Sequence, residues 1–209
     1  MIILSIDPAT SAGYALIRTM DNQADIYGYG YLDVDTSSKY QGDHCLDLMA
    51  QLQDLIYLHS VDHICVEDYF FSNRFRNGAG VNAAFRTAIH ILARQNNIPY
   101  TILNISLWKK HIAGRVTPTK EQKIKWGKEP AKKLHIQEAL WTKYNIRFPN
   151  HVISKAGKPV AFKFDISDAV AQGIYFSEGI LKKKITISVA PPDDIVFKKR
   201  PKNLFDYDS

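Results

Sequence analysis

Apolar residues near the start of the chain come in short runs, which predict strands rather than helices. Residues 2–6 form a mainly apolar run that ends in Asp7-Pro8, and this predicts a buried strand that the proline terminates. Two more strands are predicted over residues 12–17 and about 25–34. Their short connections predict an antiparallel meander.

Helical periodicity begins after this meander, with apolar residues at Leu46, Met49, Leu52 and Ile56. The pattern predicts helices over 42–59 and 79–97, and strands over 61–67 and 99–103. Further helices are expected from about 130 to 144 and from about 167 to 180, with a loop over 120–128. This order of elements is typical of a mixed sheet with helices packed on its faces.

The composition indicates an ordinary globular chain of 209 residues, with two cysteines that fit neither a disulfide framework nor a metal cluster. No apolar run approaches the roughly 20 residues needed to cross a bilayer. The N-terminus lacks the features of a secretory signal. We therefore expect a cytoplasmic protein without a membrane partner, acting in the host cytoplasm if a virus encodes it.

Four carboxylates stand where predicted strands and helices begin or end. Asp7 and Glu67 end two strands, and Asp165 and Asp168 lie three residues apart around the start of the last helix. Neighbouring strand ends and a helix laid across them can bring all four together. Converging carboxylate oxygens are the ligands that Mg²⁺ or Mn²⁺ prefers. Two such ions about 3.5–4 Å apart can activate water and stabilise a phosphodiester leaving oxygen.

Each of these acids, considered alone, could have a purely structural role. Asp7 could serve the turn before Pro8, and Asp165 could cap the helix. Asp168 is harder to explain this way, because it precedes the apolar residues 169–171 and a charge packed there needs a partner. That partner is a metal ion or a lysine.

Positive charge is concentrated between residues 109 and 133. The whole chain has a net charge of +6 and a pI of about 9.2. The candidate phosphate contacts in this stretch are Lys109, Lys110, Lys120, Lys123, Lys132 and Lys133. On charge alone, these lysines could instead form an ordinary solvated surface that binds no DNA. The aromatic run Tyr69-Phe70-Phe71, shortly after Glu67, is either core or a platform for an unpaired base, and Arg74 and Arg76 after it are candidate backbone contacts.

Three motifs, in order, resemble those of RuvC-family Holliday junction resolvases. The first is the aspartate, small-residue turn and glycine of residues 5–15. The second is the strand that ends in Glu67, followed by aromatic residues. The third is the D-x-x-D-A-x-A pattern from Asp165 to Ala171. The likeness covers roughly residues 1–181, leaving 182–209 as a C-terminal extension.

The resemblance implies an RNase H-like fold: a mixed five-stranded sheet, with three antiparallel strands and then two parallel ones, flanked by helices. It also implies a homodimer that makes paired, symmetric nicks in four-way DNA junctions with two Mg²⁺ or Mn²⁺ ions per site. Asp7, Glu67, Asp165 and Asp168 become the catalytic metal ligands. Phe70 matches an aromatic residue that stacks on a base, with Tyr69 and Phe71 as rivals.

The chain departs from the family pattern in longer segments over 115–130 and 150–164 and in its tail. These features resemble divergent viral or organellar relatives. They leave open a nuclease that cuts forks, flaps, other branched DNA or RNA–DNA hybrids. A non-catalytic junction-binding protein would keep the basic surface and lose the acids, and all four acids are present. A phosphotransferase of the actin and hexokinase type would need a second phosphate loop and a longer chain.

Overall fold

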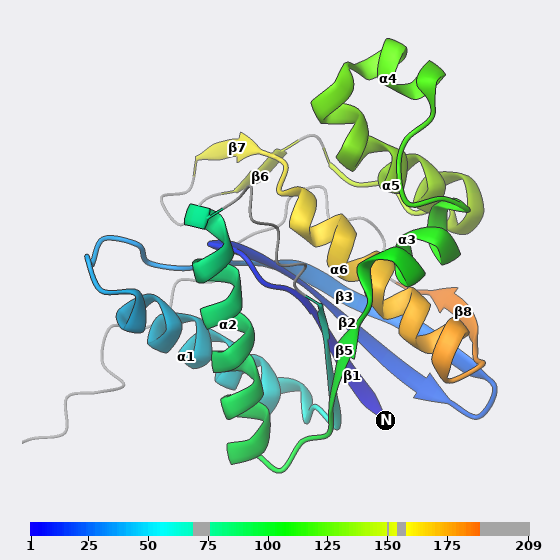
Figure 1. Cartoon of the computed structure of the whole chain (residues 1–209). Coiled ribbons are helices and arrows are strands. Elements are labelled where there is room, and N and C mark those ends of the chain that lie inside the picture. Colours follow the sequence, from blue (N-terminus) through cyan, green and yellow to red (C-terminus); the bar gives the residue numbers. More distant parts are fainter. Residues whose placement is uncertain (69–75, 150, 154–157, 189–209) are drawn as a thin grey trace, which may run out of the picture.

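The computed structural model describes residues 1–68, 76–149, 151–153 and 158–188. A six-stranded mixed sheet forms its centre, in the order β5-β4-β1-β2-β3-β8 (Figure 1). The strands are β1 (Ile2–Asp7), β2 (Ser11–Met20), β3 (Gln23–Asp33), β4 (His63–Glu67), β5 (Tyr100–Leu103) and β8 (Lys184–Ile187). Strands β6 (His151–Ile153) and β7 (Pro159–Ala161) form a separate antiparallel pair.

The predicted antiparallel meander and the two parallel strands after it are all present. Strand β1 pairs antiparallel with β2 and β2 with β3, whereas β4 is parallel to β1 and β5 is parallel to β4. The sixth strand, β8, lies in the predicted C-terminal extension and pairs parallel with residues 23–26 of β3. The predicted mixed sheet is therefore extended by one strand at the β3 edge.

Helices cover both faces of the sheet, as their apolar stripes require. Helices α1 (Gln41–His59) and α2 (Arg76–Gln95) pack on one face against residues such as Leu4 and Ile6. Helices α3 (Ile105–Ala113), α5 (Lys128–Tyr144) and α6 (Phe164–Ile174) pack on the other against residues such as Ile3 and Ile17. The alternation of neighbouring β1 residues between the two cores is the period-two geometry of a strand.

Two sequence expectations about helices are corrected. Residues 120–126 form helix α4 (Lys120–Trp126) rather than a loop, because Thr119 and Gln122 make a reciprocal capping box that satisfies the free backbone amides at its start. The last helix begins at Phe164 rather than near Ser167 and continues as a π-helix, η1 (Tyr175–Ile180). Helix α4 stands away from the sheet, beside α5 (Figure 1).

Neither cysteine is paired, and Cys65 is buried in the core on the α6 side of the sheet. Among the described residues, no helix combines the length and the apolar character needed to cross a membrane.

Candidate active site

Strand alternation points Asp7 and Glu67 to the same face of the sheet. Ile3 of β1 and Cys65 of β4 belong to the core under α6, whereas their sequence neighbours belong to the opposite core. Two-residue periodicity therefore places Asp7 and Glu67 on the α6 side. The parallel register pairs Ile6 with Val66, so the two acids follow at the same level of adjacent strands.

Helix α6 approaches the ends of β1 and β2 very closely. Gly13 lies opposite Asp7 in the sheet, and a Cβ atom added to it would lie 2.0 Å from the backbone oxygen of Asp165. The Ser5 hydroxyl donates a 2.8 Å hydrogen bond to the backbone oxygen of Ala169. These contacts lay the first turns of α6 directly over the strand ends.

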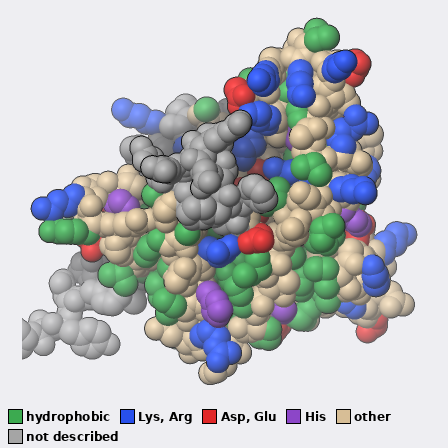
Figure 2. Space-filling model, viewed as in Figure 1, with side chains coloured by type: hydrophobic (Ala, Val, Ile, Leu, Met, Phe, Trp, Pro, Cys, Tyr) green, Lys and Arg blue, Asp and Glu red, His purple; other side chains and the backbone are tan. Residues whose placement is uncertain are grey.

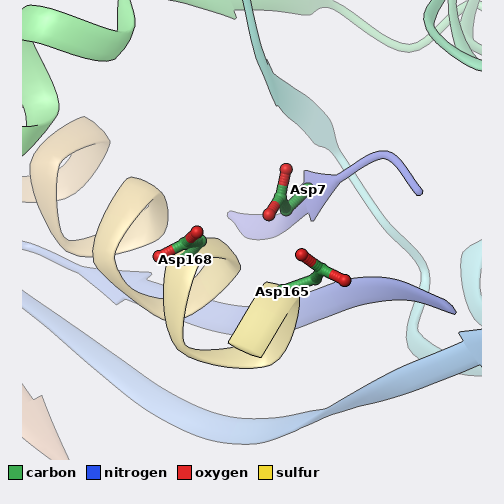
Figure 3. A group of neighbouring side chains, drawn as sticks. All are labelled: Asp7, Asp165 and Asp168. Carbon is green, nitrogen blue, oxygen red and sulfur yellow. The ribbon is translucent and has the colours of Figure 1, made fainter. Parts of the chain in front are cut away.

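The result is a cluster of three aspartates between β1 and α6 (Figure 3). One carboxylate oxygen from each of Asp7, Asp165 and Asp168 lies within 4.8 Å of the others. Asp7 and Asp168 are 8% and 2% exposed, so water screens their repulsion poorly. Glu67 lies outside this trio but lines the same cavity of about 260 Å³.

The carboxyl groups repel one another in this buried position. Burial and the neighbouring acids Glu67, Asp165 and Asp168 raise the pKa of Asp7 well above its usual range. Burial, followed by the charge of Asp168, raises the pKa of Glu67 to about 7. The cluster is therefore electrostatically unfavourable unless a cation or protons balance it.

Lys133 of α5 supplies one positive charge. Its ammonium lies 2.7 Å from Asp168 Oδ2 and 3.5 Å from Asp165 Oδ1. Burial lowers the pKa of Lys133, but Asp168, Asp7 and Asp165 outweigh that effect and raise it, so the side chain stays charged. A single ammonium balances only part of a group of four carboxylates.

The donor set fits a divalent cation. Asp168 Oδ1 is buried and makes no hydrogen bond within the described part of the chain, so it retains a free ligand oxygen. Asp7, Asp165 and Asp168 together present hard oxygen ligands, which suit Mg²⁺ or Mn²⁺ better than softer metals.

The predicted DNA contacts that the structure describes are distributed over the four helices α2, α3, α4 and α5. Lys109 of α3 lines the cavity, and Lys110 beside it is exposed. Lys132 is exposed and pairs with Glu129, while Lys120 and Lys123 are exposed on α4. Arg76 begins α2. The predicted positions Tyr69, Phe70, Phe71 and Arg74 lie outside the described residues.

Some residues in the cavity wall and behind it were not predicted. Asn82 and Arg86 of α2 line its wall, and Arg86 forms a 2.7 Å ion pair with Asp68. Gln172 of α6 donates a 3.1 Å hydrogen bond to Glu67 Oε2. Asn82 and Arg86 stand in no motif. Gln172 directly follows the D-x-x-D-A-x-A pattern and interrupts an apolar helix face four residues after Asp168, where a buried polar residue indicates a partner.

The mixed sheet with helices on both faces defines an α/β protein, and the carboxylates at its strand ends form an acidic cluster that could hold a metal ion. The sequence profile of crossover junction endodeoxyribonuclease RuvC matches residues 3–128. The RuvC protein of Helicobacter pylori strain G27 is 32% identical over 126 residues, which cover 58% of this chain and 76% of that protein. The chain belongs to the RuvC family, and the resemblance of its motifs is confirmed.

Solved structures show the same fold. Thermus thermophilus RuvC superposes with a TM-score of 0.59 at 14% identity, covering 86% of this chain and 97% of that one. The T. thermophilus RuvC in complex with Holliday junction substrate gives a TM-score of 0.57 at 15% identity, covering 85% and 93%. The predicted RNase H-like α/β fold is confirmed. The profile match includes Asp7 and Glu67 and ends before Asp165 and Asp168, which the folded geometry brings to them.

Proposed function

We propose that this protein is a structure-selective endodeoxyribonuclease that resolves four-way DNA junctions by paired, metal-dependent hydrolysis of phosphodiester bonds. The observation that carries the proposal is the convergence of Asp7, Asp165 and Asp168 at the strand ends of a RuvC-family fold. The relatives are named crossover junction endodeoxyribonucleases, and one structural neighbour is bound to a Holliday junction.

Asp7, Asp165 and Asp168 would hold the metal, with Glu67 beside them in the same cavity. We propose two Mg²⁺ ions per site, with Mn²⁺ as a substitute. When bound, such ions lower the pKa of water and stabilise developing charge on the phosphate. The four acids are both the proposed metal ligands and the proposed catalytic residues.

The chain itself contributes position and charge. Helix α6 is fixed against β1 and β2, so its two aspartates are held in place before DNA binds. Lys133 keeps a positive charge against the carboxylates, and Lys109 lies on the cavity wall where a phosphate would enter. The site is thus built to bind an anionic backbone beside a group of acids that would otherwise repel it.

The proposed DNA surface extends from the cavity along α3, α4 and α5. Lys and Arg side chains gather on this projecting part of the molecule (Figure 2). Lys110, Lys120, Lys123 and Lys132 are exposed there and would contact phosphates without reading sequence. In the same proposal Arg74 and Arg76 touch the backbone, and one of Tyr69, Phe70 and Phe71 stacks on an unpaired base near the branch point.

Paired nicks require two active sites on one junction, and we therefore propose that the protein acts as a homodimer. The proposed nuclease domain comprises residues 1–181. The extension over residues 182–209 contributes β8 to its sheet. A cytoplasmic location, in the host if a virus encodes the chain, stays a prediction.

A nicking assay on a labelled four-way junction in Mg²⁺ or Mn²⁺ tests the proposal. The wild-type protein should nick opposing strands symmetrically, and Asp168→Asn should bind the junction without cutting it. Asp54→Asn, on the exposed side of α1 across the sheet, is the matched control and should cut normally.

Other outcomes separate the alternatives. Equal cutting of Y-shaped DNA, flaps or hybrids would keep the nuclease and remove the four-way selectivity. Tight junction binding without cutting in either metal would leave a binding protein. For the dimer, mixing wild-type protein with excess Asp168→Asn should give junctions nicked in one strand only, whereas unchanged paired nicking would argue against two cooperating subunits.

A further inference from the structure

Gln172 is a fully buried polar side chain in the most apolar part of α6. It lies four residues after Asp168, on the same side of the helix, and is 0% exposed. The neighbouring residues from Ala169 to Ile174 are otherwise small or apolar and are all buried. An amide in this position must find partners inside the protein or lose the hydrogen bonds that water gives it.

Only half of this amide is satisfied within the described residues. Its Nε2 donates a 3.1 Å hydrogen bond to Glu67 Oε2, whereas its Oε1 is buried without a hydrogen-bond partner. An unsatisfied buried acceptor costs about 1–3 kcal/mol, which an apolar side chain of the same size would avoid. Packing alone therefore does not explain a glutamine here, and the bond to Glu67 does.

The backbone around Gln172 is held rigidly. A Cβ atom added to Gly173 would lie 2.5 Å from Ile17 Cδ1 and 3.3 Å from Ser5 Cβ, so this turn of α6 lies directly on β1 and β2. The hydrogen bond from Ser5 to the Ala169 backbone holds the preceding turn. The amide of Gln172 thus has a fixed position from which it can orient the flexible side chain of Glu67.

We propose that Gln172 is a positioning residue that holds the Glu67 carboxylate in place for divalent metal binding beside Asp7 and Asp168. It acts through Glu67 and does not line the cavity itself. This inference rests on the proposed function, because it takes Glu67 to be part of the metal site. Partners that orient the ligands of a metal typically account for 10–100-fold in metal affinity.

Mn²⁺ binding to the full-length protein without DNA tests the inference, with affinity measured by calorimetry and stability by thermal unfolding in EDTA. Gln172→Met, which keeps the volume and removes the amide, should weaken Mn²⁺ binding about 10–100-fold and leave the protein folded. Gln51→Met is the matched control. Gln51 is a buried glutamine of α1 that donates a 2.8 Å hydrogen bond to Asp47, and its Oε1 likewise has no partner among the described residues. Its loss should not change Mn²⁺ affinity.

A double variant shows whether Gln172 acts through Glu67. In a Glu67→Gln background, Gln172→Met should weaken Mn²⁺ binding no further. Wild-type affinity in Gln172→Met, or independent losses in the double variant, would overturn the inference and leave the nuclease proposal intact. Absence of Mn²⁺ binding by the wild-type protein would refute both this inference and the proposal of a metal-dependent nuclease. Loss of folding in both Gln172→Met and Gln172→Leu would assign Gln172 a packing role and also overturn the inference.

Discussion

Lys133 balances part of the buried negative charge, and its replacement by methionine isolates that contribution. The substitution keeps a long side chain on α5 and removes the ammonium that lies 2.7 Å from Asp168 and 3.5 Å from Asp165. In metal-free protein, Asp165 and Asp168 then lose the ammonium that is paired with them. We expect Lys133→Met to be clearly less stable than the wild type in EDTA.

The exposure of the two partners sets the size of this effect. Breaking a fully buried ion pair costs about 3–5 kcal/mol, because one charge remains buried without compensation. The Asp168 side chain is only 3% exposed, but that of Lys133 is 40% exposed, so water already screens part of the interaction. A loss of about 1–3 kcal/mol is therefore expected. For a chain of this size it lowers the Tm by roughly 3–10 °C.

Thermal unfolding in EDTA and in excess Mn²⁺ measures the effect, with Lys132→Met as control. Lys132 is the adjacent lysine, and it forms an ion pair with the solvent-exposed Glu129, so its loss should leave the stability nearly unchanged. Bound Mn²⁺ supplies the charge that Lys133→Met removes, so the difference from wild type should shrink in Mn²⁺. Equal Tm shifts for the two variants, or a Mn²⁺-independent loss, would refute the reasoning.

Three further predictions concern pH, packing and DNA binding. The pKa values of Asp7 and Glu67 are raised in the folded state, so the stability they contribute is complete below their unfolded pKa values near 4–4.5 and is lost at higher pH. For Glu67 this loss occurs as the pH rises through its folded pKa of about 7. Urea unfolding in EDTA should therefore show a lower free energy of unfolding at pH 8 than at pH 5, with at most roughly 3 kcal/mol of the difference from Glu67. The free energy of unfolding should depend less on pH in Glu67→Gln, and a stronger dependence would contradict the raised pKa of Glu67. Gly13→Ala should cost about 1–3 kcal/mol and weaken Mn²⁺ binding, because its Cβ would displace Asp165, whereas Gly42→Ala meets nothing within 4 Å and should be tolerated in the same assays. Replacing Lys120, Lys123 and Lys125 by alanine should reduce the slope of log affinity for a four-way junction against log salt by up to about 3, as measured by fluorescence anisotropy, with Mn²⁺ affinity unchanged; an unaltered slope would place the DNA elsewhere.

The central strands of the sheet could be predicted because a buried strand requires a short apolar run in its own sequence. The apolar runs over 2–6 and 61–67 must be strands between two helical layers, and they form β1 and β4. Helix α4 could not be predicted in this way, because none of its residues is buried and its sequence has no apolar stripe. Its stability comes from the capping box at Thr119 and from packing against α5. For the C-terminal extension, a strand and an irregular tail were both open from the sequence, because the strand β8 has only four residues and is fixed by its pairing with β3.

The acids of the site could be predicted because each stands where an apolar strand ends or an apolar helix begins, and a charge in such a position needs a partner. The relative positions of these acids could not be predicted, since they depend on contacts between residues far apart in the sequence. Gly13 allows α6 to approach the sheet, and this approach brings Asp165 and Asp168 to Asp7 while Glu67 stays just outside the trio. The position of the Lys133 ammonium among the carboxylates likewise depends on how α5 packs beside α6. Sequence reasoning named Lys133 only as a DNA contact, although it left an unspecified lysine as one of two possible partners for Asp168.

The burial of α6 has a consequence for how the enzyme would choose its substrate. Every residue from Ile166 to Ile174 is buried, so this helix should exchange its amide hydrogens only when the whole domain unfolds. Two of the candidate metal ligands therefore sit on an element that cannot shift to meet a DNA strand. The DNA must adapt instead, and a branched molecule with unstacked, pliable strands at its centre reaches such a recessed site at a lower deformation energy than a stiff linear duplex. A rigid active site would in this way favour DNA molecules that are flexible at their centre.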